Sequence, residues 1–76
     1  MNATHPLSDT ALRGSIRAEM ARQGFTQRDL AGLLGMSQPT VSARMTGRKD
    51  FTVSEVRRIA AWLGVPLSRL IAEDAA

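Results

Sequence analysis

A helix stop followed at once by a helix start, at Gly35-Met36-Ser37, constrains the fold of this chain more than any other feature. Glycine readily adopts the left-handed conformation that ends a helix, and serine is a favoured N-cap. Pro39 then falls in the first turn of the next helix, where its missing N–H is tolerated. Because so short a turn holds two helices at a fixed angle, the sequence predicts a helix-turn-helix over roughly residues 27–46.

The first helix of this pair has a complete start signal. The Thr26 hydroxyl can accept a hydrogen bond from the third backbone N–H of the helix, while the Asp29 carboxylate reaches back to the cap. Phe25 and Leu30 occupy the two positions of a hydrophobic staple. We therefore expect a short helix over residues 27–34. Its apolar side carries Leu30, Leu33 and Leu34.

One more helix is expected before this pair. Apolar residues recur every four positions at Leu12, Ile16 and Met20, which is the spacing of one helix face. Ser8 or Asp9 can cap this helix, and Gly24 is its stop signal. The pattern predicts a helix over about residues 9–23.

Two helices are expected after the pair. Thr52 and Glu55 form a capping box that opens a core helix, and Gly64 ends it. Its apolar face is expected to carry Val53, Val56, Ile59, Ala60 and Leu63. Pro66 then starts a final turn or two. The apolar residues of that last helix are Leu67, Leu70 and Ile71.

These signals predict an all-α protein, a compact bundle of five short helices with no strands and no repeats. A chain of 76 residues is expected to form one domain, here residues 9–73 between a flexible tail at 1–8 and a short one at 74–76. At this size there is little room for a buried active-site cleft, and no Ser/His/Asp or paired-carboxylate arrangement is present. We therefore expect no enzyme activity.

Cofactors and membrane insertion are also not expected. His5 stands alone without ligand spacing to another histidine or to any cysteine, so we expect no metal site and no other cofactor. The sequence has no run near the ~20 apolar residues of a membrane span and no secretory signal. The absence of cysteine fits a reducing cytoplasm, which is the predicted location.

The charge distribution favours a nucleic-acid partner. The formal net charge is +3, and nine of the ten basic residues are arginine. The arginine guanidinium can form two parallel hydrogen bonds with a phosphate or a guanine. Residues 38–49 contain three basic residues and no acid, whereas residues 50–76 contain three arginines against four acids. Arginine-rich composition also occurs in proteins of other functions, so the concentration on one segment is the stronger argument.

The third helix carries little apolar surface. Only Val41 and Met45 are clearly apolar within residues 38–46, so most of this helix is left for a partner. Gln38 lies at its start, and glutamine can bond both N6 and N7 of adenine in the major groove. The alternative for Gln38 is an ordinary solvated side chain beside a cap.

Four stretches of the sequence resemble the lambda-type repressor/Cro helix-turn-helix family. They are residues 25–31, residues 35–42, Gly47 and residues 59–65. The resemblance implies five helices and binding to double-stranded operator DNA with the third helix in the major groove. It also implies that Gln27, with Thr26 beside it, contacts a phosphate and that Gln38 contacts a base.

The same resemblance places further base-reading positions on Pro39, Ser42 and Ala43, and phosphate contacts on Thr40 and Thr46. Ser42 can donate or accept a hydrogen bond, but Pro39 and Ala43 can only touch apolar surface such as a thymine methyl. This chain departs from the family at Ala43, where a longer polar side chain is common.

It also departs at Arg44, where family members commonly place an apolar residue on the core. We expect Arg44 to lay its stem on the core and to reach DNA with its guanidinium, the alternative being a solvated charge. Arg48 and Lys49 lie in the following loop, where family members grip the DNA backbone, and they too could be simply solvated. The remaining arginines of the first half are interpreted as helix-surface charges: Arg13, Arg17, Arg22 and Arg28.

The predicted function is a sequence-specific transcriptional regulator, a repressor or a Cro-like phage switch protein, that binds as a homodimer through residues 62–71. Trp62 is assigned to the core or this interface, because no second aromatic residue lies nearby to form a stacking platform. The alternative is an antitoxin-type interaction module, which would need a larger exposed apolar patch. No small-molecule ligand is indicated.

Overall fold

The computed structural model describes residues 10–71 of the chain. These residues form five helices and no strand: α1 (Thr10–Gln23), α2 (Gln27–Leu34), α3 (Gln38–Thr46), α4 (Val53–Leu63) and α5 (Leu67–Leu70). The expected all-α bundle is therefore confirmed. Ser8 and Asp9, proposed as caps for α1, lie outside the described residues, as do both tails.

The helix ends are set by the local signals that predicted them. At the start of α2, the backbone N–H of Thr26 donates to the Asp29 carboxylate at 2.8 Å, and the N–H of Asp29 donates to the Thr26 hydroxyl at 3.2 Å. Gly35 closes α2 with φ 68°, a left-handed conformation that costs little without a Cβ. The helix-turn-helix is thus built from a capping box, one glycine and the Ser37 cap of α3.

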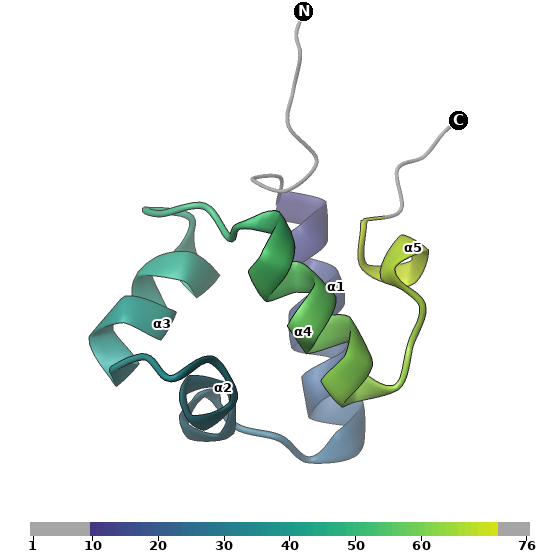
Figure 1. Ribbon diagram of the computed structural model, residues 1–76, viewed down its shortest axis with the longest axis horizontal. Helices are drawn as coiled ribbons and strands as arrows, with labels where there is room; N and C mark the ends of the chain where they lie inside the picture. Colours follow the sequence, from purple (N-terminus) through teal and green to yellow (C-terminus); the bar gives the residue numbers. More distant parts are fainter. Residues whose placement is uncertain (1–9, 72–76) are drawn as a thin grey trace, which may run out of the picture.

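α1 and α4 pack together in the centre of the molecule, with α2 and α3 on one side and α5 on the other (Figure 1). Between them lies a single core of buried apolar side chains. It consists of Leu12, Ile16, Met20, Leu30, Ala31, Leu34, Val41, Met45, Phe51, Val56, Ile59, Ala60, Leu63 and Leu70. Each helix contributes to this core, so the mutual angle of α2 and α3 is fixed by packing as well as by the turn.

Two residues at the start of α4 differ from the expectation. Val53, the first residue of α4, was assigned to the core face, but it is 48% exposed. Phe51, which was not assigned to the core, is 3% exposed. Phe51 and Val56 occupy the staple positions around the Thr52 cap, as Phe25 and Leu30 do around Thr26.

Three helix ends are completed by side chains from other helices. Gln23 donates to the Leu63 carbonyl of α4 at 2.8 Å, and Arg58 donates to the Leu33 carbonyl of α2 at 2.6 Å. Arg17 donates to the Met45 carbonyl of α3 at 3.1 Å. The last carbonyls of a helix have no partner within it, so these bonds satisfy acceptors that would otherwise need water. The interpretation of Arg17 as a plain surface charge is therefore wrong.

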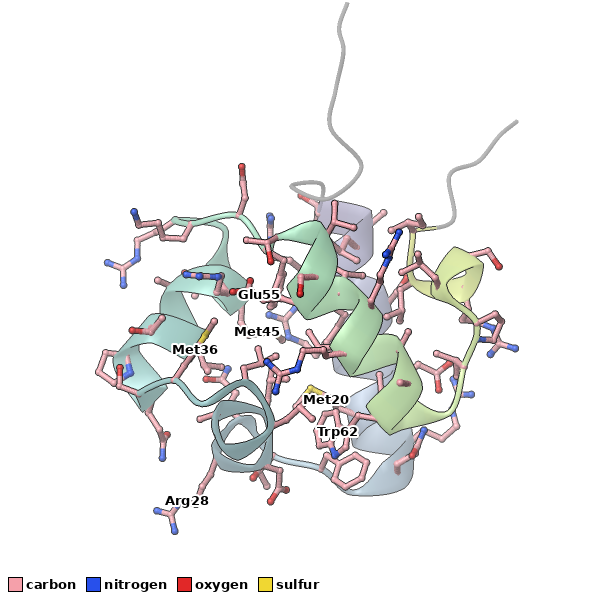
Figure 2. All side chains as sticks on the ribbon, in the orientation of Figure 1. Met20, Arg28, Met36, Met45, Glu55 and Trp62 are labelled. Atoms are coloured by element: carbon pink, nitrogen blue, oxygen red, sulfur yellow. The ribbon has the colours of Figure 1, made fainter. Side chains whose placement is uncertain are left out.

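The aromatic residues form one pair. The rings of Phe25 and Trp62 stack with centroids 4.1 Å apart and planes at 27°. Trp62 lies beside the turn between α1 and α2 (Figure 2). The expectation that no second aromatic lies near Trp62 is wrong, because the fold brings together residues that are far apart in sequence. Both side chains are half-buried against the core, which agrees with a packing role for Trp62.

α5 is attached by burial and by charge. Leu70 is fully buried, and Arg69 donates to the carboxylate of Glu19 on α1 at 3.2 Å. Glu19 is itself buried and also lies 3.5 Å from the Arg22 guanidinium, so its charge is compensated. Leu67 and Ile71 are half-buried against the core.

Candidate nucleic-acid interface

α3 lies at the edge of the bundle farthest from α5, which leaves its outer side uncovered (Figure 1). Val41 and Met45 are the residues that anchor it in the core. They are four positions apart and therefore share one face of the helix. The opposite face is free of apolar core residues, as the sequence predicted for this helix.

The expected base-reading residues occupy this outer region to different extents. Gln38 and Pro39 are exposed in the first turn, whereas Ser42 and Ala43 are half-buried one turn later. Among the described residues the Gln38 side chain has no hydrogen-bond partner, so both its carbonyl and its amide are available to an external group. The first turn of α3 is thus the part best equipped to make new polar contacts.

The threonines expected on the DNA backbone have hydroxyls that already make bonds within the chain. Thr26 donates to the Asp29 carboxylate at 3.0 Å, and Thr46 donates to the Ser42 carbonyl at 2.9 Å. The Thr40 hydroxyl lies 2.9 Å from that of Ser37. A hydroxyl has one hydrogen, so Thr26 and Thr46 would have to give up an internal bond to donate to a phosphate. Gln27 is exposed and has no such competing bond in the described part of the chain.

Arg44 is held by α4. Its Nε and Nη2 donate to Oε1 and Oε2 of Glu55 at 3.1 and 3.2 Å, a two-point pairing in which both side chains are largely covered, at 16% and 14% exposure. Partial burial of Glu55 opposes ionisation, but the bonds from Arg44 and Thr52 outweigh it and lower the pKa of Glu55. The hydrogen bond with Glu55 likewise raises the pKa of Arg44. From the sequence we expected this guanidinium to contact DNA, whereas in the structure it is paired with Glu55.

The loop after α3 presents two exposed cations. The backbone N–H groups of Arg48 and Lys49 both donate to the Ala43 carbonyl, at 2.9 and 3.2 Å, which fixes the loop against the last turn of α3. Their side chains make no ion pair within residues 10–71. The loop therefore carries two free positive charges on an ordered backbone.

A third free cation, Arg28, lies on α2 and was interpreted from the sequence as a surface charge. Its side chain is exposed and points away from the helix (Figure 2). It follows directly after Gln27, so it belongs to the same first turn of α2. That adjacency is the signal that could have placed Arg28 in the candidate interface with Gln27.

Of the basic residues in the part of the chain that the structure describes, those with neither an ion pair nor a hydrogen-bond partner are Arg28, Arg48, Lys49 and Arg57. Three of these four belong to α2 or to the loop that follows α3. The candidate interface therefore consists of the outer side of α3, with free cations on the preceding helix α2 and in the loop that follows α3.

No group of three metal-ligating side chains occurs within residues 10–71. In the same range, no helix is long and apolar enough to cross a membrane.

Comparison with known proteins agrees with this geometry. The helix-turn-helix family matches residues 16–70, which includes most of α1 and all four later helices. No match was found among curated proteins. The matching family consists of DNA-binding regulators that are generally not enzymes. The chain belongs to the lambda repressor/Cro-like helix-turn-helix family of DNA-binding transcription regulators.

Proposed function

We propose that this protein is a sequence-specific operator-binding regulator that inserts α3 into the major groove of double-stranded DNA. The observation that carries the proposal is the free side chain of Gln38 on the exposed first turn of α3, flanked by the free cations Arg28, Arg48 and Lys49. A helix fits the major groove, whose width is ~12 Å, and only there do all four base pairs differ in hydrogen-bonding pattern.

The proposed roles divide by chemistry. Gln38 reads a base through its free amide, and Ser42 adds one donor or acceptor further along the helix. Pro39 and Ala43 provide close apolar contact to base methyl groups. This is a small reading surface, so a large share of the affinity is expected to come from phosphate contacts.

The phosphate contacts are assigned to both ends of the motif. Gln27 and Arg28 serve the strand beside α2, and Arg48 and Lys49 serve the strand beside the loop after α3. Thr26, Thr40 and Thr46 lie close to these positions, and their hydroxyls remain able to accept bonds or to exchange an internal bond for a phosphate.

We further propose that two copies bind one operator. One domain of this size covers little DNA, and helix-turn-helix dimers read half-sites ~34 Å apart. The proposed interface is the segment 62–71, where Trp62, Leu67 and Ile71 remain half-buried in the single chain. Bound in this way, the protein acts in the cytoplasm as a repressor or a Cro-like switch by blocking or recruiting polymerase at the operator.

The alternative, an antitoxin-type module that covers another protein and binds DNA secondarily, gains no support from the surface. Among the described residues the exposed large apolar side chain is that of Val53. Scattered single apolar residues are normal on protein surfaces and do not make a docking patch.

Selection of random duplex DNA on the purified protein tests the proposal. The selected sequence is then titrated against a scrambled duplex at physiological salt. We expect a two-fold related motif bound at least ~10³ times more tightly than scrambled DNA. Binding that is weak and equal on all sequences would contradict the proposal and favour the interaction module instead.

A further inference from the structure

We infer that Glu55 limits the sequence-independent affinity of the protein for DNA, because it holds Arg44 against α4 and so withholds a cation from the DNA backbone. The inference rests on the proposed function, since it concerns how tightly the same surface binds DNA of any sequence. Glu55 itself lies on α4, outside the candidate interface.

Arg44 and Glu55 form a two-point ion pair that links α3 to α4. Glu55 Oε1 accepts from Arg44 Nε at 3.1 Å and from the backbone N–H of Thr52 at 2.9 Å, while Oε2 accepts from Arg44 Nη2 at 3.2 Å. Figure 2 shows Glu55 in the space between the two helices. Every oxygen of the carboxylate is therefore engaged, and the guanidinium is held in one orientation.

The position of Arg44 on α3 explains how this ion pair would affect DNA binding. Arg44 follows Thr40 by four residues, so the two lie on one side of the helix, and both are half-buried at the boundary between core and outer surface. Thr40 is one of the proposed phosphate contacts. A guanidinium released from Glu55 would extend from this same edge, where a long flexible arginine side chain reaches a phosphate.

A released Arg44 would add a further phosphate contact. Such contacts strengthen binding to every sequence equally and carry no direct sequence information. The proposed base-reading set is small, with Gln38 and Ser42 as its polar members, so phosphate contacts supply a large share of the total affinity. By neutralising Arg44, Glu55 removes one sequence-independent contact from a segment, residues 38–49, that contains no acid of its own.

The test compares three variants by fluorescence anisotropy on scrambled duplex over a range of salt concentrations, and then on the selected operator. Glu55→Gln is the informative variant, because the glutamine oxygen can still accept from the Thr52 N–H, while the charge is lost and an NH2 group replaces the oxygen that accepts from Arg44 Nη2. Asp50→Asn is the matched control. It makes the same change in net charge at an exposed acid without releasing an arginine. Arg44→Gln combined with Glu55→Gln removes both members and restores the wild-type net charge.

For Glu55→Gln we expect the slope of log affinity against log salt on scrambled DNA to steepen by ~0.9, with about threefold tighter binding at low salt to scrambled DNA and to the operator alike. Asp50→Asn should leave the slope unchanged, and the double variant should match the wild type. A double variant whose slope is shallower by about one contact would mean that Arg44 already binds DNA, which overturns the inference. An unchanged slope in folded Glu55→Gln overturns it as well.

The experiment distinguishes a failure of the inference about Glu55 from a failure of the proposed function. The slopes are measured on scrambled DNA and do not require a known operator. If wild type discriminates its operator while Glu55→Gln behaves like wild type, only the inference about Glu55 fails. If wild type binds no sequence preferentially, the proposed function fails, whatever the slopes of the variants.

Discussion

The guanidinium of Arg17, on α1, donates a hydrogen bond of 3.1 Å to the backbone carbonyl of Met45, in the last turn of α3. The positive charge of Arg17 also interacts favourably with the partial negative charge at the carboxyl end of α3. The helix proposed to read DNA is therefore tied to the centre of the bundle at the end that lies away from Gln38.

Replacing Arg17 by methionine should lower the free energy of unfolding by about 1 kcal/mol, because the bond to the Met45 carbonyl is lost while the apolar stem is kept. Urea unfolding followed by circular dichroism measures this change. Arg57→Met, on α4, is the control, since Arg57 is exposed and has neither an ion pair nor a hydrogen-bond partner among the described residues, and its effect should stay within about 0.5 kcal/mol. Equal losses in the two variants would contradict the assigned role of Arg17.

Phe51 should prove a core residue despite its place in a loop. Phe51→Ala is expected to cost ~3–5 kcal/mol, because it empties a buried aromatic site and removes the staple to Val56. Val53→Ala, two residues later but 48% exposed, should change stability by less than about 0.5 kcal/mol. Thermal or urea unfolding of both variants measures the change in the free energy of unfolding. A Phe51→Ala protein as stable as wild type would show that Phe51 does not stabilise the core.

The Arg44–Glu55 pair predicts a specific loss of stability in acid. The pKa of Glu55 is lowered in the folded protein, so the folded state favours the ionised form. This stabilisation is fully present above the ordinary glutamate pKa of ~4.3 and is lost as the pH falls through the lower folded value. Arg44, whose pKa is raised, stays charged throughout this range.

Unfolding titrations between about pH 6 and pH 2 on wild type and Glu55→Gln isolate this contribution, because the other carboxylates are common to both proteins. The free-energy difference between the two should shrink as the pH falls below ~4.3. A difference that is constant over the whole range would show that the charge of Glu55 does not stabilise the fold.

The sequence predicted the helix ends because they depend on signals within a few residues of each other. The boxes at Thr26 and Thr52 and the glycines at positions 35, 47 and 64 all act locally. Phe51 belongs to the same class, since its staple with Val56 repeats the one recognised at Phe25, and it could have been found in the same way.

The partners of the arginines could not be predicted in this way. Whether Arg44 reaches DNA or Glu55 depends on how α3 and α4 pack, and the same holds for Arg17 at the end of α3 and Arg58 at the end of α2. The stack of Phe25 on Trp62 also depends on this packing. The sequence therefore predicted the position of the candidate interface on the chain and two of its cations, Arg48 and Lys49, whereas Arg28 and the pairing of Arg44 emerged only from the structure.

The first turn of α3 is proposed to read bases, while the loop after it contacts the DNA backbone. Titration of Gln38→Ala and Lys49→Ala against the selected operator and its single base-pair variants tests this most directly. Gln38→Ala is expected to lose ~1–3 kcal/mol at the operator and to become indifferent to one base pair. Lys49→Ala should weaken binding to all sequences alike and make the salt slope shallower by about one contact. Equal weakening of every sequence by both variants would show that Gln38 does not read a base.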